Sequence, residues 1–307
     1  MNPYKYPPVS PRFNLQLKEK NGRWWQYMVD FPVAMPTGHK KHNTALGEYF
    51  QPVEGKEWPL VILLHGWGDR STTPCRLLAK DLAKRGIASF MLYSVFHTRR
   101  MADVIRRRLP KLTDDEWFEG YQTSVVDVRQ IIDWAQGKGT FNKDQIAIIG
   151  VSLGGIISAI SMGVDKRIRA GVILTAGGNY ENPKWRWITG TRRTAAEYAE
   201  AQRMYQQYLA EVAKKGFEKV EPPKRSYLTD PLTFAVSLRN RPLLMINASL
   251  DERIPKQSSL DLWEAAGRPD IKWLPGTHSS IWLLYPRIRS EVLTFLTSVF
   301  KLSPKNR

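Results

Sequence analysis

A serine between glycines is the residue whose setting points most directly to chemistry. Gly150-Val-Ser-Leu-Gly154 matches the pattern G-x-S-x-G, which places a serine hydroxyl on a sharp turn between a strand and a helix. The flanking sequence predicts that context, because residues 146–149 form an apolar run typical of a buried strand and residues 156–162 are apolar enough for a buried helix. We therefore expect Ser152 to be a nucleophile. The alternative is a glycine-rich turn without a catalytic role.

A serine hydroxyl is a poor nucleophile at neutral pH, so this hypothesis requires a histidine base and an acid that orients it. Residues 243–247 predict a buried strand that runs into a loop carrying Asp251, and residues 271–274 predict a strand whose Pro-Gly turn carries His278. The order serine, acid, histidine is the one expected with this motif. We expect Ser152, Asp251 and His278 to meet at one edge of the sheet as a triad. Taken singly, the acid could be a turn former and the histidine a surface residue.

Other titratable residues suit these roles less well. Glu252 follows the turn, and Asp230 precedes a proline in the manner of a helix N-cap. His39 and His42 lie in a lysine-bearing loop, where we expect both to be solvated, and Cys75 lies in a predicted helix with no evident base. The five histidines and one cysteine have scattered spacing, so we expect no metal site and no cofactor.

Acyl transfer also needs hydrogen-bond donors for a developing oxyanion. The backbone N–H of Leu153, directly after the serine, is one candidate. The turn His65-Gly-Trp-Gly68 follows a buried strand predicted at residues 60–64, and its glycines let the main chain bend toward the site. We assign the second donor to the N–H of Trp67 and expect His65 to hold the turn in place.

Strands and helices alternate along the chain around these motifs. The strand at residues 60–64 is followed by a helical pattern at 76–85 and a strand pattern at 87–93, and Thr113 with Glu116 forms a capping box that opens a further helix. Additional elements are predicted as strands at 170–174, 243–247 and 271–274 and as helices at 261–266 and 286–302. The alternation predicts an α/β fold with a mostly parallel sheet flanked by helices.

Two regions depart from this alternation of strands and helices. Residues 13–53 mix aromatic and charged residues with glycines and predict an early antiparallel ribbon. Residues 180–224 contain a second capping box, Thr194 with Glu197, which opens a long polar helix. Without a linker composition anywhere, we expect a single domain over residues 1–307, with 180–224 as an inserted helical cap.

Tryptophans near these motifs suggest where a substrate binds. Trp185 and Trp187 lie in the expected cap, and Trp67 and Trp282 lie beside the catalytic motifs. We expect these rings to line an apolar pocket for a small acyl or aryl group. The alternative, which is equally compatible with the sequence, is that these rings pack in the core.

The motifs together resemble those of serine hydrolases of the α/β-hydrolase fold. The resemblance covers nearly the whole chain, from His65-Gly-Trp-Gly68 through Gly150-Val-Ser-Leu-Gly154 to Asp251 and His278. It implies an eight-stranded, mostly parallel sheet with a cap after the sixth strand. The oxyanion turn is more similar to that of bacterial esterases and the dienelactone-hydrolase-like branch than to the His-Gly-Gly-Gly turn of lipases. Dienelactone hydrolases carry a cysteine at the position of Ser152, and haloalkane dehalogenases and epoxide hydrolases carry an aspartate, so their substrates are disfavoured here.

The implied activity is that of a carboxylesterase, which cleaves a small-molecule ester through an acyl-enzyme intermediate. Thioesters and activated amides could react at the same groups, so a thioesterase and a peptidase-like acyl hydrolase stay open. A catalytically silent, ligand-binding member of the fold is an alternative from another class, and an intact triad disfavours it.

The net charge of the chain bears on which partners it could bind and not on its fold. The 307 residues include 46 Lys and Arg against 29 Asp and Glu, a net charge of +17, which by itself would suit a nucleic acid. The arginines lie in no recognisable DNA- or RNA-binding motif, so no nucleic-acid partner is expected. The clusters Arg99-Arg100 and 106–108 are expected on a solvated face, with steering of anionic substrates as the alternative.

Composition also bears on compartment. A single cysteine excludes an intrachain disulfide, and the N-terminal residues lack the apolar segment of a secretory signal, so we expect a cytoplasmic location. Residues 145–164 carry no charge and are about as long as a membrane-spanning helix, yet their internal glycines predict a strand, a turn and a helix instead. No membrane span is expected.

Overall fold

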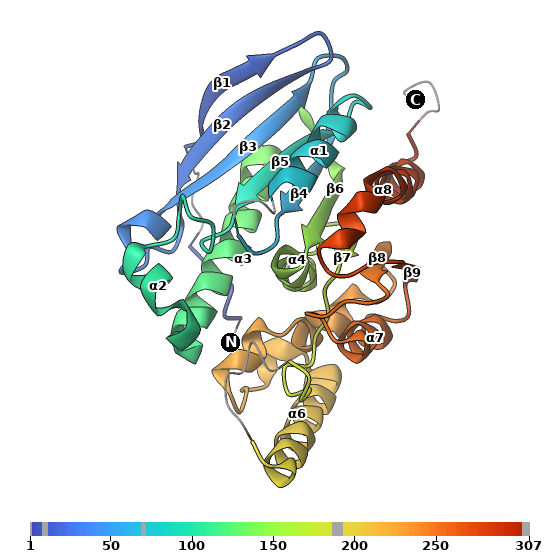
Figure 1. Ribbon diagram of the computed structural model, residues 1–307. Helices are drawn as coiled ribbons and strands as arrows, with labels where there is room; N and C mark the ends of the chain where they lie inside the picture. Colours follow the sequence, from blue (N-terminus) through green and yellow to red (C-terminus); the bar gives the residue numbers. More distant parts are fainter. Residues whose placement is uncertain (1, 8–11, 69–71, 186–192, 303–307) are drawn as a thin grey trace.

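The computed structural model describes residues 2–7, 12–68, 72–185 and 193–302, and within them nine strands form one sheet (Figure 1). The strand order is β1-β2-β3-β5-β4-β6-β7-β8-β9. The strands are β1 (Asn14–Lys20), β2 (Trp24–Pro32), β3 (Thr44–Pro52), β4 (Trp58–Leu64), β5 (Ala88–Tyr93), β6 (Phe141–Val151), β7 (Ala170–Leu174), β8 (Leu243–Ala248) and β9 (Asp270–Leu274).

Six adjacent strands of the sheet run parallel: β5, β4, β6, β7, β8 and β9. The remaining pairs are antiparallel: β1 with β2, β2 with β3, and β3 with β5. This confirms the predicted fold class and the early antiparallel ribbon. The family resemblance implied eight strands, whereas the sheet has nine, because the antiparallel ribbon contributes three strands, with the mostly exposed β1 at the edge.

Helices α3 and α4 pack on one face of the sheet and α1 and α8 on the other, whereas α6 lies away from the sheet (Figure 1). The bounds of the helices are α1 (Thr72–Ala83), α2 (Asp103–Arg108), α3 (Asp114–Gly137), α4 (Leu153–Val164), α6 (Ala195–Lys215), α7 (Lys256–Ala265) and α8 (Tyr285–Phe300). Short 3-10 helices connect them: η1 (Lys40–His42), η3 (Leu109–Lys111), η4 (Phe217–Lys219), η5 (Arg225–Thr229), η6 (Pro231–Leu238) and η7 (Ser280–Leu284).

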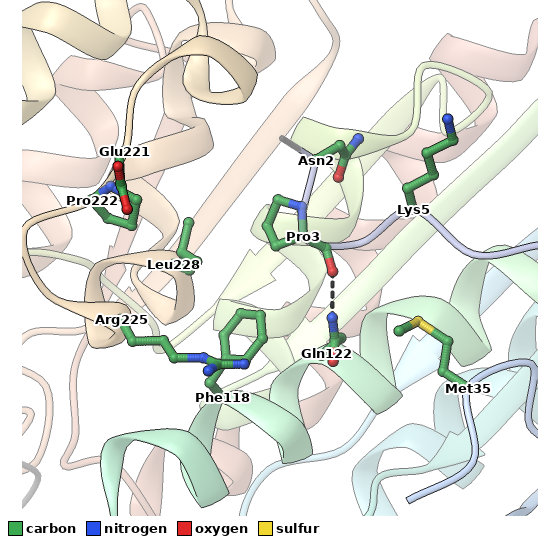
Figure 2. A pocket seen from close by; sticks show the side chains of 10 residues that line it. All are labelled: Asn2, Pro3, Lys5, Met35, Phe118, Gln122, Glu221, Pro222, Arg225 and Leu228. Carbon is green, nitrogen blue, oxygen red and sulfur yellow. Dashed lines mark hydrogen bonds between the residues drawn. The ribbon is translucent and has the colours of Figure 1, made fainter.

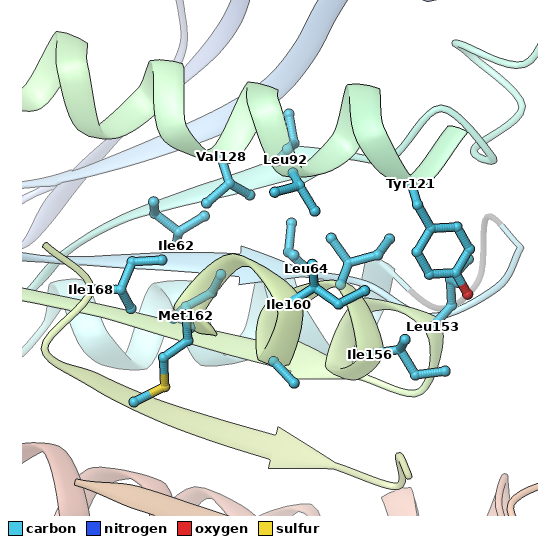
Figure 3. Packing of buried hydrophobic residues seen from close by; sticks show 14 of the residues in the cluster. Ile62, Leu64, Leu92, Tyr121, Val128, Leu153, Ile156, Ile160, Met162 and Ile168 are labelled. Atoms are coloured by element: carbon cyan, nitrogen blue, oxygen red, sulfur yellow. The ribbon is translucent and has the colours of Figure 1, made fainter. Parts of the chain in front are cut away.

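Strand β4 is buried on both faces of the sheet. Its residues Ile62 and Leu64 pack into one apolar cluster with α3 and α4, as Figure 3 shows, whereas Val61 and Leu63 pack into a second cluster with α1 and α8. Successive strand side chains point to opposite faces, so a strand buried on both sides must be apolar throughout. Each such side chain contributes about 1.5–3 kcal/mol on burial.

Two helices begin where local sequence predicts. Thr113 accepts a hydrogen bond from the backbone N–H of Glu116 while the Glu116 carboxylate accepts one from the Thr113 N–H, which opens α3. Thr194 and Glu197 form the same reciprocal pair at the start of α6. Both capping boxes satisfy amides that have no partner within the helix, which explains why a pattern of four residues suffices to locate these starts.

The uncharged segment 145–164 is divided between β6 and the twelve-residue helix α4, as its glycines predicted. Among the described residues, none of the helices combines the length and apolar character needed to cross a membrane.

A buried ion pair corrects two expectations about surface charge. Arg100 and Asp127 are both fully buried and their side chains lie 2.8 Å apart. Arg100 also donates to the carbonyl oxygens of Tyr93 and His42, at 2.8 and 3.1 Å. Arg100 is therefore not part of a solvated cluster. His42, expected to be solvated, is 4% exposed, and burial, together with His39 and Arg100, lowers its pKa to about 4.

We expect Arg100→Met to lower the free energy of unfolding by about 3–5 kcal/mol, because the Asp127 carboxylate would remain buried without its cation. Urea denaturation measures the change. The matched control is Arg203→Met, which removes an exposed pair with Glu200 and should have little effect. Equal stability of the two variants would contradict a role for the buried pair.

Candidate active site

Ser152 lies at the junction of β6 and α4 in a conformation that serine rarely adopts. Its φ is 53° and its ψ is −118°. The surrounding strands and helix hold it there, because its N–H donates to the carbonyl of Leu174 in β7 at 2.8 Å and its carbonyl accepts from the N–H of Ile156 at 3.1 Å. A strained backbone of this kind persists only where its neighbours over-determine it.

The glycines on either side of Ser152 allow this turn to pack tightly. A Cβ at Gly150 would lie 2.1 Å from the carbonyl oxygen of Gly154. A Cβ at Gly154 would lie 2.2 Å from the carbonyl oxygen of Leu64 and 2.6 Å from that of His65. The start of α4 therefore rests directly on the end of β4, which brings the turn after β4 beside Ser152.

The structure brings together the three side chains that the sequence predicts as a triad. His278 Nε2 lies 2.9 Å from Ser152 Oγ, and His278 Nδ1 lies 2.8 Å from Asp251 Oδ2 and 3.0 Å from Oδ1. Because a carboxylate can only accept, Nδ1 carries the proton, and Nε2 is left to accept from the serine hydroxyl. The imidazole is 8% exposed.

Backbone bonds between the ends of β8 and β9 position the acid and the histidine. Ser249 N–H donates to Leu274 O at 2.8 Å, and Leu250 N–H donates to Gly276 O at 3.0 Å. The Asp251 carboxylate accepts from the N–H groups of Arg253 and Ile254, at 2.9 and 2.8 Å. These bonds fix the carboxylate in the orientation that meets the ring.

The rejected acids have other partners. Glu252 accepts from the backbone N–H of His278 at 2.9 Å and does not reach the ring nitrogens. Asp230 caps η6 by accepting from the N–H of Leu232 at 3.0 Å, as its position before a proline predicted, and burial raises its pKa to about 6. Cys75 is buried in α1, and burial raises the pKa of its thiol to about 12. Within the described chain no group of histidines, cysteines and acids could hold a metal ion.

The turn after β4 is tied down by His65. Its Nε2 accepts from the N–H of Ser94 at 3.2 Å, so Nδ1 carries the proton and donates to the carbonyl of Gly66 at 2.6 Å. Leu153 is the first residue of α4, so its N–H has no partner within the helix. That the N–H groups of Leu153 and Trp67 face an oxyanion stays a prediction.

A family model described as "Alpha/beta hydrolase domain containing 18" matches residues 28–294 of the chain. The chain belongs to this α/β-hydrolase family. No curated protein matches the chain.

Solved structures similar to this α/β-hydrolase include a zinc-bound cold-adapted esterase from an Arctic intertidal metagenomic library. The two chains are 18% identical, the match covers 93% of this chain and 99% of that one, and the TM-score is 0.58. Acetyl xylan esterase 1 from Thermoanaerobacterium sp. JW/SL YS485 has 15% identity, covers 95% of this chain and 89% of its own, and has a TM-score of 0.64. The α/β-hydrolase GrgF from Penicillium sp. sh18 has 17% identity, with 89% and 98% covered and a TM-score of 0.59. At these identities the similarity establishes the fold alone.

The tryptophans expected to line a pocket of this α/β-hydrolase lie in different surroundings. Trp185 is fully buried, packs edge-on against Tyr180 and donates from Nε1 to Ser258 Oγ, so its ring offers no surface to a ligand and the packing alternative holds for it. Trp187 lies outside the described residues. Trp282, in η7, is partly exposed and packs against the apolar cluster of α1 and α8, and its role as a substrate contact stays a prediction.

A pocket of about 510 Å³ lies away from these residues (Figure 2). Ten residues from the N-terminal segment, the loop after β2, the N-terminal half of α3 and the stretch around η5 line it, and none of them is a member of the candidate triad. Figure 2 shows Gln122 of α3 bonded to the carbonyl of Pro3 there, and Arg225 lies over the ring of Phe118 at 4.6 Å.

We expect Gly154→Ala to destabilise the α/β-hydrolase by roughly 1–3 kcal/mol or more, because the new methyl group would meet backbone carbonyls that cannot turn aside. Thermal or urea unfolding checks this. Gly137→Ala is the control, since nothing lies within 4 Å of a Cβ at the end of α3. If both alanines were tolerated equally, the packing of α4 against β4 would not be as close as described.

Proposed function

We propose that the protein is a serine hydrolase that cleaves carboxylic esters, with Ser152 as nucleophile, His278 as general base and Asp251 as the group that orients it. The observation that carries the proposal is the continuous hydrogen-bonded line from Asp251 Oδ2 through His278 to Ser152 Oγ, with separations of 2.8 and 2.9 Å. An acid, an imidazole and a hydroxyl in this order activate the hydroxyl for attack on a carbonyl carbon.

The reaction runs in two halves. His278 Nε2 takes the proton of Ser152 as Oγ attacks the ester carbonyl, and the carbonyl oxygen becomes an oxyanion. The imidazolium then gives its proton to the leaving alcohol as the carbon–oxygen bond breaks, which leaves an acyl-enzyme. Water loses a proton to His278, attacks the acyl carbon and releases the carboxylic acid, and Ser152 regains its proton. Asp251 stabilises the imidazolium in both halves.

The developing oxyanion would accept from the N–H groups of Leu153 and Trp67. Leu153 begins α4, and the N-terminus of a helix favours negative charge. Each such donor stabilises the transition state by about 3 kcal/mol. The bonds of His65 to Gly66 and Ser94 support this assignment because they hold the turn that carries Trp67.

Esters are the substrate class that the comparisons favour, because two of the similar structures described above are esterases. Thioesters and activated amides stay alternatives, since they react by the same two halves. A silent ligand-binding protein would have no use for a strained serine bonded to a histidine. We also infer a small-molecule substrate, no nucleic-acid partner and a cytoplasmic location, the last supported by the single buried thiol of Cys75.

We expect Ser152→Ala to lower kcat/KM for p-nitrophenyl acetate by roughly 10⁴-fold or more, because no other group supplies the nucleophile. A fluorophosphonate probe should label the wild-type protein and not the variant. Ser279→Ala, which removes an exposed hydroxyl next to the base, serves as the control and should keep its activity. Full activity of Ser152→Ala would reject the assignment.

We propose that residues 180–224 act as a cap over the site, anchored by one carboxylate. Glu181 is 4% exposed and accepts from Lys224 Nζ at 2.5 Å and from Tyr227 OH at 3.0 Å, and it also pairs with Arg193. Glu181 and Lys224 lie at opposite ends of the segment. A single buried acid therefore supports closure of the loop that carries α6.

We expect Glu181→Gln to destabilise the protein by about 1–3 kcal/mol at pH 7, because two cations lose a charged acceptor. Burial by itself would raise the pKa of Glu181, but hydrogen bonds from Lys224 and Arg193 hold this pKa below its usual value. A carboxyl group whose pKa is lowered in the folded state stabilises the fold at pH values above its pKa in the unfolded state. The difference in free energy of unfolding between wild type and Glu181→Gln should therefore shrink below about pH 4. Urea unfolding at pH 7 and 3.5 measures it, with Glu264→Gln, at an exposed pair with Arg268, as control. A pH-independent difference would refute the anchor.

A further inference from the structure

An aromatic cluster beside the candidate oxyanion turn is not used by the triad. Trp67 stacks on Phe96 with ring centroids 5.5 Å apart, and Phe96 lies 5.1 Å from Trp117 of α3. Trp67 and Trp117 also lie 6.0 Å apart. We call these three rings the aromatic wall. They come from three segments, the loops after β4 and β5 and the first turns of α3.

The wall is held in place rather than loosely assembled. Phe96 is 4% exposed and forms its base. A Cβ at Gly120 would lie 2.3 Å from the edge of the Phe96 ring, so α3 can approach the loop this closely only with glycine there. Trp67 and Trp117 remain partly exposed, and their rings are the accessible part of the wall.

Sheet topology decides which half of the site the wall borders. Ser152 follows β6, whereas Asp251 and His278 follow β8 and β9 on one side of it. Trp67 and Phe96 follow β4 and β5 on the other side. The leaving alcohol must face His278, which protonates it. We infer that the acyl group lies on the opposite side, toward β4 and β5. The wall therefore borders the acyl half.

The wall continues toward the start of α4. Tyr121, one helical turn beyond Trp117, has its ring 6.1 Å from Phe96. Figure 3 shows Tyr121 directed from α3 toward Leu153 and Ile156 at the start of α4. The hydroxyl of Tyr121 lies 3.2 Å from that of Tyr180, which follows β7. Aromatic side chains thus extend from the oxyanion turn to the residue next to the nucleophile.

We propose that the aromatic wall is the acyl-binding subsite and that Trp117 selects esters whose acyl group carries an aromatic ring. The inference rests on the proposed function and names its substrate class. Offset and edge-to-face contacts between rings are more favourable than contacts of equal area with a saturated ring, and two partly exposed indoles supply such faces. A preference of roughly 3- to 10-fold in kcat/KM follows.

The test compares p-nitrophenyl phenylacetate with p-nitrophenyl cyclohexylacetate, which share a leaving group and differ in the flatness of the ring. Wild-type protein should favour the phenyl ester by roughly 3- to 10-fold in kcat/KM. Trp117→Leu should bring the ratio close to one, and Trp117→Phe should retain part of it. A merely structural defect would lower both rates in parallel and leave the ratio unchanged.

Trp25→Leu is the matched control, because this partly exposed tryptophan lies on β2 in the antiparallel ribbon. It should leave the ratio as in wild type. A wild-type ratio near one, or a preference that survives Trp117→Leu, would overturn the inference while leaving ester hydrolysis intact.

Failure of the proposed function has a different signature. If no ester is cleaved and a fluorophosphonate probe does not label Ser152, calorimetric binding of phenylacetate and cyclohexylacetate takes the place of the rate ratio. Tighter binding of phenylacetate that is lost in Trp117→Leu would uphold the wall without the hydrolase. Equal binding of the two acids would overturn it.

Discussion

The strained backbone of Ser152 is the constraint on which the rest of the site depends. A φ of 53° at a serine is maintained by close contacts on three sides: β7 through the carbonyl of Leu174, β4 through the carbonyls that face Gly154, and α4 itself. These contacts leave the hydroxyl at the carboxyl edge of the sheet. The loops after β8 and β9 then need only reach the same edge for the imidazole of His278 to meet it.

Buried charges connect the irregular segments that the sheet does not organise. Arg100 joins its own loop, the loop before β3 and α3 through Asp127 and two carbonyl oxygens. Glu48 of β3 accepts two bonds from Arg76 of α1, at 3.0 and 2.6 Å. Glu181 closes the segment that contains α6. In each case the carboxylate and its cationic partners together offset the cost of leaving water, which neither side could do alone.

The parts predicted correctly from the sequence are those set by local patterns or by topology. The capping boxes at Thr113 and Thr194 depend on four consecutive residues, so tertiary contacts do not change them. Asp251 and His278 are 27 residues apart in the sequence, yet their contact was predictable because parallel strands end at a common edge of the sheet. His42 and Trp185 were placed less well because each lies in an irregular segment, where burial depends on distant partners such as Arg100 and Ser258.

The sequence by itself determined the order of strands and helices, the turn at Ser152 and the pairing of an acid with a histidine, because periodicity, capping and glycine spacing act over a few residues. Only the tertiary structure decided which aromatic and charged side chains are covered. Trp185 is buried whereas Trp117 keeps an accessible face, and Arg100 is buried whereas neighbouring Arg99 is exposed. These outcomes follow from contacts between segments far apart in the chain, and the free energy of burial depends on the packed surface rather than on residue type alone.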